Sequence, residues 1–420
     1  MELDALDLTK IREKLCEFID PSQRADAMLA SAPGRADFLN THQDYKGLPV
    51  VPVAVRLRCY AAGSLNGTGH IRFASVNLRE KSEDFRDEFS LDNVVLKGGG
   101  WFGDYVRAIF SFLQKGARKT AGMDIAIWSQ VPIGSGLSSS ASLEVSVVQL
   151  ASTCLGYELD RRELAETAYS AEHDVMGIPC GRLDQYASAY GGIIKLETKP
   201  PFKVEHLSGR DLLFVIVYSG EQRRITSVHP IRQQEIDDAL RLLMDEVRVP
   251  KQLAKKLGYR YYDPLWEDIA EEEIRPYFAS LPEKLANRIL FTLRMQRSTE
   301  YALGLLGQTD AHVSPARNSQ LPKPTVGDRL AGLGMIMNYQ HELLRDLCEV
   351  STPTLERLRN TLLASGALGA KISGAGGGGS VISLVRDRDI AERVRKACVA
   401  SGFSEVWVST PDVGAIVESD

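Results

Sequence analysis

A run of small residues at positions 132–142, with the sequence PIGSGLSSSAS, constrains the fold of this chain more than any other segment. The residues before it form an apolar run that predicts a short buried strand (Ile125, Ile127 and Val131). The residues after it are apolar at helical spacing (Leu143, Val147, Leu150, Ala151 and Cys154). The run is therefore expected to join a strand to the N-terminus of a helix.

Such a junction suits an anion, because the first turn of a helix has unpaired backbone N–H groups and lies at the positive end of the helix dipole. Gly134 and Gly136 allow the backbone to approach the anion closely. Ser138, Ser139 and Ser140 add hydroxyl groups that can donate to phosphate oxygens or bind a metal ion. The other interpretation at this point is a flexible turn with a serine cap.

Length and composition predict a soluble protein of two large domains, because 420 residues exceed one ordinary core. The hydrophobic content is 44% and the charged content 25%, as in globular proteins. A formal charge of −5 and the lack of dense basic runs predict no nucleic-acid partner. No apolar run reaches the roughly 18 residues of a membrane span, so no membrane partner is expected. Six scattered cysteines without a secretory leader favour a reducing cytoplasm.

The pattern along the chain is mixed α and β. The first 30 residues predict an amphipathic helix that Pro33-Gly34 breaks, and strands are expected at 50–57, 71–76 and 212–217. Residues 233–305 predict helices, and 312–327 a surface loop. A change of pattern near 186–212 divides the chain into expected domains at 1–205 and 206–420.

A second glycine motif, Gly98-x-Gly100-x-x-Gly103, has the spelling of a dinucleotide-binding turn and would suggest a dehydrogenase. The apolar run before it is short, and bulky Trp101 lies inside the turn. We therefore interpret it as a loop leading into a helix that contains Tyr105 and Leu113.

A third glycine cluster, residues 371–379 (KISGAGGGG), precedes a strand-like run at 381–385. A turn between two strands would need only two residues. The number of glycines indicates that this backbone approaches another group closely.

Two segments carry residues suited to chemistry. Residues 33–47 place Arg35, Asp37, His42 and Asp44 within ten positions, and this polar loop suits a hydroxyl-rich ligand. Residues 172–185 end a helical pattern in a turn with glycine and proline and then present an acid, Asp184. Phosphoryl transfer could use such an acid.

In their order along the chain, these motifs resemble the GHMP kinase superfamily, and most closely its galactokinase branch. The resemblance covers residues 30–385 and implies a two-domain α+β fold, with an N-terminal domain like ribosomal protein S5 and a ferredoxin-like C-terminal domain. It implies an ATP- and Mg²⁺-dependent sugar 1-kinase that acts on galactose or a related hexose, pentose or uronic acid. The partner is then a small sugar, and the protein a monomer or a weak homodimer.

The resemblance also implies roles for single residues. The catalytic residues are Asp184, beside the attacking sugar hydroxyl, and Arg35, which stabilises charge on the transferred group. Ser139 and Glu172 are the metal ligands. The residues expected to bind ATP are Gly134, Gly136, Leu137, Ser138, Ser139, Ser140 and Ala141. Those expected to bind the sugar are Asp37, Thr41, His42, Asp44, Tyr45, Gly181, His229, Gly376 and Gly377.

Three departures from the branch lie on the sugar side. Thr41 stands where galactokinases ordinarily have a sugar-contacting glutamate, and His229 where they have a tyrosine. Asn40 replaces a usual glycine. These changes predict altered sugar specificity. The competing hypotheses are a non-catalytic sensor on the same fold and the dehydrogenase suggested by the turn at Gly98.

Overall fold

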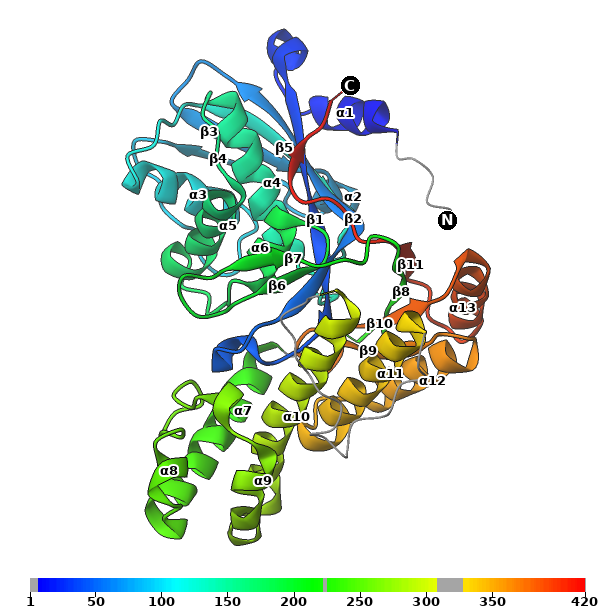
Figure 1. The fold of residues 1–420 in the computed structure, drawn as a ribbon. Helices are drawn as coiled ribbons and strands as arrows, with labels where there is room; N and C mark the ends of the chain where they lie inside the picture. Colours follow the sequence, from blue (N-terminus) through cyan, green and yellow to red (C-terminus); the bar gives the residue numbers. More distant parts are fainter. Residues whose placement is uncertain (1–6, 222–224, 308–327, 420) are drawn as a thin grey trace.

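Two β-sheets organise the molecule, and the computed structural model describes residues 7–221, 225–307 and 328–419 (Figure 1). The first sheet has six strands in the order β12-β1-β2-β5-β3-β4. Strands β3 and β5 are parallel, and the other neighbours are antiparallel. The strands are β1 (Met28–Leu39), β2 (Val51–Leu65), β3 (His70–Ser75), β4 (Arg86–Ser90), β5 (Met123–Ser129) and β12 (Ile416–Val417).

Helices cover both faces of this sheet. One face carries α3 (Asp104–Lys115), α4 (Ser139–Cys154), α5 (Arg161–Ser170) and α6 (Leu183–Tyr190) (Figure 1). The other face carries the predicted leading helix α1 (Leu8–Cys16). Side chains alternate across a strand, so Ala61 of β2 joins the core under α4, while Tyr60 and Ala62 join the core under α1.

The second sheet is antiparallel, with the order β11-β8-β10-β9. Its strands are β8 (Leu213–Tyr218), β9 (Gly369–Ser373), β10 (Ser380–Val385) and β11 (Val406–Ser409). Val215 and Val217 of β8 face a core with α12 (Pro353–Ala364) and α13 (Arg388–Ala400). Phe214 and Ile216 face the opposite core, which also contains Phe38 of β1. The two sheets therefore share a hydrophobic core.

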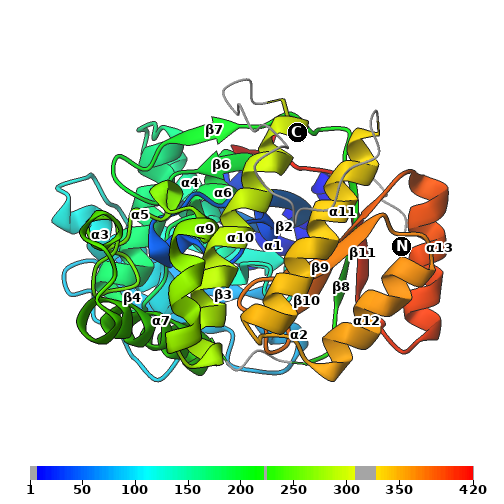
Figure 2. The same ribbon diagram turned by 60° about the horizontal axis from the view of Figure 1, so that its bottom comes forward.

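A helical arm extends away from the sheets in Figure 1 and points toward the viewer in Figure 2. It contains α7 (Ile225–Arg241), α8 (Lys251–Ala254), α9 (Glu271–Ile274) and α10 (Glu283–Leu305), with a core around Trp266. Helix α10 packs beside α11 (Arg329–Glu342) in both views. Leu48, from the segment after β1, packs into the core of the arm. The arm thus holds the loop in which sugar-binding residues were predicted.

The remaining elements are α2 (Val76–Glu80), the strand pair β6 (Ile194–Leu196) and β7 (Val204–His206), and short turns of 3₁₀- and π-helix. The loop predicted at 312–327 lies outside the described residues. Across the parts of the chain that the structure describes, no helix is both long and apolar enough to cross a membrane.

One sequence expectation was wrong in its detail. Pro33-Gly34 does not end the leading helix, which stops at Cys16, but lies inside β1. The pairing of β1 with β2 shifts its register between Pro33 and Arg35, so the dipeptide marks a β-bulge. The C-terminal strand β12 also returns to pair with β1, so residues 416–417 belong to the first sheet.

Candidate active site

The serine–glycine run lies between a strand and a helix, as predicted. Strand β5 ends at Ser129 and α4 begins at Ser139. Gly134, Gly136 and Ser138 have φ of 76°, 81° and 62°, so the backbone turns through the left-handed region three times within five residues. A serine there is strained, and such strain is concentrated at functional sites. The Ser138 hydroxyl is buried without a partner among the described residues, as in a site built for a ligand.

Contacts with distant segments hold this loop in place. The Arg35 N–H donates to the Leu137 carbonyl at 3.1 Å, and a Cβ on Gly34 would lie 2.6 Å from the same oxygen. The Ser380 hydroxyl donates to the Ser135 carbonyl at 2.8 Å. The side chains of Leu137 and Ala141 are buried in cores, so only their backbone can face a ligand.

A cavity of about 930 Å³ opens beside Ser139 and Ser140. Its lining combines aromatic side chains with polar groups from both sheets, including Asn77, Trp101, Phe102, Tyr105, Gln130, Tyr218 and Trp407. Apolar walls with a few polar groups are typical of small-molecule sites. Sequence reasoning missed these residues, although Trp101, inside a glycine-rich turn, was a signal that could have indicated them.

The turn at Gly98 leads into helix α3, as interpreted from the sequence. Asp104, the first residue of the helix, accepts from the N–H groups of Lys97 and Gly98 at 2.8 and 2.7 Å. Strand β4 before the turn is antiparallel to β3, and β5 after the helix does not pair with β4. A dinucleotide-binding unit needs two parallel strands around its helix, so the dehydrogenase hypothesis is wrong.

Glu172 lies across the first turn of α4, on a turn of π-helix over Ala171–Val175. Its carboxylate accepts from Gln185 Nε2 at 2.6 Å. Burial, followed by the negative charge of Asp184, raises the pKa of Glu172, while hydrogen bonds from Cys180, Ser140 and Gln185 oppose this shift. The serine hydroxyl that meets Glu172 is thus that of Ser140, next to the predicted ligand Ser139.

Asp184 of α6 and Arg35 of β1 form an ion pair beside the serine loop. Arg35 Nε and Nη2 donate to Asp184 Oδ1 at 2.8 and 2.6 Å, and Nη1 donates to the Gly136 carbonyl at 2.7 Å. Arg35 Nη1 also lies 3.2 Å from Asp37 Oδ1. Burial opposes the charged form, but the charges of Asp184 and Asp37 prevail and raise the pKa of Arg35. Arg35 therefore joins the loop backbone to two acids.

The C-terminal glycine cluster joins β9 to β10 and contacts this region. The Gly374 N–H donates to Asp37 Oδ2 at 3.0 Å, and His42 Nε2 bonds the Ala375 carbonyl at 2.9 Å. The close approach predicted for these glycines involves the protein's own backbone. A Cβ on Gly376 would lie 2.5 Å from the Val350 carbonyl oxygen, and one on Gly378 2.7 Å from that of Glu221. Among the described residues, only Val228 lies within 4 Å of a Cβ added on Gly377, at 3.9 Å.

Lys371, at the start of the glycine cluster, is completely buried. Its Nζ donates to the carbonyls of Asp37 and Ile372, both at 2.9 Å, and to Thr41 Oγ1 at 2.7 Å. Burial lowers the pKa of Lys371 to about 8. Position 41 therefore faces a buried amine.

The other predicted sugar residues gather next to these. The rings of His42 and His229 lie 4.8 Å apart, and Tyr45 lies 5.4 Å from His229. A Cβ on Gly181 would lie 3.1 Å from Asp44 Oδ2, so the second predicted segment meets the first here. Burial raises the pKa of Asp44, and the nearby His229 opposes this shift. Arg35 and Asp37 lie on strand β1 itself, not on the loop expected from the sequence.

Asn40, the departure from a usual glycine, has φ of 63°. Asparagine is among the residues that best tolerate this conformation, so Asn40 can adopt the left-handed backbone that a glycine would adopt there. Its Nδ2 donates to Gln296 Oε1 at 2.8 Å.

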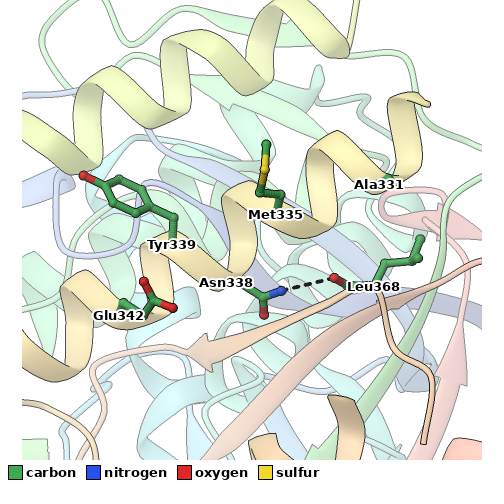
Figure 3. A pocket seen from close by; sticks show the side chains of 6 residues that line it. All are labelled: Ala331, Met335, Asn338, Tyr339, Glu342 and Leu368. Atoms are coloured by element: carbon green, nitrogen blue, oxygen red, sulfur yellow. Dashed lines mark hydrogen bonds between the residues drawn. The ribbon is translucent and has the colours of Figure 1, made fainter. Parts of the chain in front are cut away.

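A smaller pocket of about 260 Å³ lies on α11 and is lined by Ala331, Met335, Asn338, Tyr339, Glu342 and Leu368 (Figure 3). Asn338 Nδ2 donates to the Leu368 carbonyl at 3.1 Å across it. It contains none of the predicted site residues.

Comparison with known proteins agrees with this geometry. The profile of the GHMP kinase N-terminal domain matches residues 104–192, that of the GHMP kinase C-terminal domain residues 327–404, and the galactokinase galactose-binding signature residues 17–65. A galactokinase of Thermococcus kodakarensis is 30% identical over 93% of this chain and 100% of its own length. The chain belongs to the galactokinase branch of the GHMP kinases.

Two further relatives place this kinase within the superfamily. The crystal structure of Lactococcus lactis galactokinase complexed with galactose superposes with a TM-score of 0.77 and 25% identity, over 97% of this chain and 99% of that one. A mevalonate kinase of Pyrococcus horikoshii is 28% identical over 88% of this chain and 92% of its own length. The two-domain GHMP kinase fold is thus confirmed, and the protein is an ATP-dependent sugar kinase. Nothing in these comparisons supports the non-catalytic sensor.

Proposed function

We propose that this kinase transfers the γ-phosphoryl group of ATP to the anomeric hydroxyl of a monosaccharide, galactose or a related sugar. The observation that carries the proposal is the contact of Arg35 with both Asp184 and the Gly136 carbonyl of the serine loop, at 2.6–2.8 Å. It brings an acid suited to a sugar hydroxyl next to a loop suited to phosphates.

On the donor side, the cavity beside Trp101 and Trp407 has room for a nucleoside, and its floor at Ser139 and Ser140 leads to the N-terminus of α4. The phosphate oxygens would accept hydrogen bonds from the backbone N–H groups of that helix turn and of residues 134–141. Mg²⁺ would be held by Glu172 and the hydroxyl of Ser139 together with the ATP phosphates. The described residues contain no group of three or more His, Cys, Asp and Glu side chains suited to a metal. One carboxylate plus phosphates is a usual Mg²⁺ environment, so the residues present fit the ion.

When bound, Mg²⁺ neutralises charge on the transferred phosphoryl group. The chain supplies the rest. Asp184 would lie beside the attacking hydroxyl and orient it or accept its proton. Arg35 would stabilise charge on the phosphoryl group and hold the Asp184 carboxylate in place through its direct hydrogen bonds. Positioning and electrostatics are the main sources of catalysis in such reactions.

On the acceptor side, the sugar would lie against Asp37, Thr41, His42, Asp44, Tyr45, Gly181 and His229, covered by Gly376 and Gly377. The buried Lys371 donates to Thr41 Oγ1, so the Thr41 hydroxyl hydrogen is free to be donated elsewhere. A carboxylate at this position could only accept. The exchange supports a preference for a sugar other than galactose.

The test is ATP-dependent turnover over a panel of hexoses, pentoses and uronic acids. We expect the highest kcat/KM for a sugar that differs from galactose at the carbon facing Thr41. A clear preference for galactose would refute altered specificity but leave the kinase assignment intact. Thr41→Glu is the matched variant, and we expect it to move the preference toward galactose.

Three predictions about the whole protein accompany this proposal. The kinase is a monomer or a weak homodimer, it acts in the cytoplasm, and neither nucleic acid nor membrane is a partner. The division of the chain at residue 205 likewise stays a prediction.

A further inference from the structure

Glu144 is a completely buried carboxyl group that neither the sequence motifs nor the proposed mechanism use. It lies on the inner face of α4, after the serine loop. Gln185 Nε2, at 3.3 Å from Glu144 Oε2, is its hydrogen-bond donor. Burial, and then the charge of Glu172, raises the pKa of Glu144 well above its ordinary value.

The hydrogen bonds that Gln185 can make indicate the protonation state of the Glu144 carboxyl group. A glutamine side chain has two N–H donors and one acceptor oxygen. Both donors are used, toward Glu172 Oε2 at 2.6 Å and Glu144 Oε2 at 3.3 Å. The acceptor Gln185 Oε1 is buried and, within the described residues, receives no donor.

Glu144 Oε1 likewise is buried and receives no hydrogen bond from the described residues. With Glu144 ionised, no group in the described part of the chain would donate a hydrogen bond to two buried acceptor oxygens, Glu144 Oε1 and Gln185 Oε1. Leaving buried polar groups unsatisfied costs about 1–3 kcal/mol each. A proton on Glu144 Oε1 provides the missing donor and completes a paired acid–amide contact.

We propose that Glu144 is a positioning residue: it stays a neutral carboxylic acid, donates its proton to Gln185 Oε1, and so fixes the amide of Gln185 with its N–H toward Glu172. The reversed amide would place Oε1 against the Glu172 carboxylate, and both are acceptors. Gln185 fixed in this way presents Glu172 to the first turn of α4. The role in Mg²⁺ binding rests on the proposed function of Glu172, whereas the protonation of Glu144 does not.

The first experiment detects the proton directly. Infrared difference spectra between the wild-type protein and Glu144→Gln, both without ligands at neutral pH, should contain the carbonyl band of one protonated carboxyl group, which shifts in D₂O. A difference spectrum with no such band means that Glu144 is ionised and overturns the proposal.

The second experiment measures the Mg²⁺ dependence of the full-length kinase. Glu144→Leu removes the donor, and we expect the apparent KM for Mg²⁺ to rise about tenfold, as is typical for groups that orient a metal ligand. Glu144→Gln replaces the O–H by an N–H and should keep this KM within about threefold of wild type. Gln185→Leu should match Glu144→Leu, and the double variant should add little, because the two residues act as one unit.

The matched control is Val148→Ala, a buried position on the same helix without polar contacts to this network. It should lower Tm while leaving the KM for Mg²⁺ unchanged, and this separates positioning from general destabilisation.

Equal losses in Glu144→Gln and Glu144→Leu would show that a charge is needed, and an unchanged KM in Glu144→Leu would remove the positioning role. Either result overturns the proposal. If the protein showed no Mg²⁺-dependent turnover, the proposed function would fail. The infrared band would still show whether Glu144 is protonated.

Discussion

The proposed donor and acceptor sides of the candidate active site are built in different ways. The donor loop is one continuous segment, 132–142, whose shape comes from left-handed glycines and a helix N-terminus. The acceptor side brings together parts of β1, the loop after it, α6, α7 and the glycine cluster, held by side chains such as Arg35, Lys371 and His42.

The difference shows where each side can vary. A loop that binds through backbone N–H groups depends little on side-chain identity, provided that its conformation is kept. A pocket assembled from side chains of distant segments changes specificity when one residue changes. The departures at 41 and 229 lie on the proposed acceptor side, as this comparison predicts for a family with a common donor.

Replacing the acid of the acceptor side should have the largest effect. We expect Asp184→Asn to lower kcat by about 10³-fold, within the range for loss of a group that handles a proton. ATP binding should persist, because the donor loop is untouched. Steady-state kinetics and calorimetric titration of ATP would check this, with Asp174→Asn, an exposed acid of the same segment, as control. An unimpaired rate would refute the role of Asp184.

A substitution in β1 should disturb the donor side. In Gly34→Ala the new Cβ would lie 2.6 Å from the Leu137 carbonyl oxygen and displace the serine loop. Overpacking costs about 1–3 kcal/mol, so we expect the KM for ATP to rise about tenfold or more. Gly69→Ala is the control, because no atom of the described residues lies within 4 Å of its added Cβ. An unchanged KM for ATP would mean that the loop does not depend on its contact with β1.

The pH dependence should separate the two sides. Burial lowers the pKa of Lys371 to about 8, so the ammonium form is present below that pH and is lost as pH rises through it. The neutral amine has one donor fewer for Thr41 and the carbonyls of Asp37 and Ile372. We therefore expect the KM for the sugar to rise a few-fold above pH 8, with little change in the KM for ATP.

Lys371→Met should remove this alkaline change, and the two profiles measured side by side give the contribution of the lysine. The same rise in both proteins would assign it to another group.

The smallest effect is expected at Ser138, with φ of 62°. Ser138→Gly relieves strain of about 1 kcal/mol and should raise Tm slightly. Ser138→Ala keeps the Cβ and removes only the hydroxyl. If the donor side binds through its backbone, both variants should keep the KM for ATP within a few-fold. A large loss in both would instead assign the binding to the hydroxyl.

The donor loop could be predicted because its signal is local. Glycines and serines between an apolar strand pattern and a helical pattern define both the turn and the anion site in neighbouring positions. The nucleotide-sized cavity could not be predicted, because its walls come from residues as distant as Asn77 and Trp407. In the sequence Trp101 is only a bulky residue inside a glycine turn, and its place in the cavity wall depends on how α3 packs.

The motifs were enough to predict the superfamily, the two-domain α+β fold and the segments of the candidate site, because each motif encodes its own backbone conformation. The tertiary structure decided which residues meet. It placed Arg35 and Asp37 on a strand rather than a loop, put Lys371 against Thr41, and buried Glu144 behind Gln185. Such contacts join positions tens to hundreds of residues apart. The strength of their hydrogen bonds and charge interactions is set only when packing removes the groups from water.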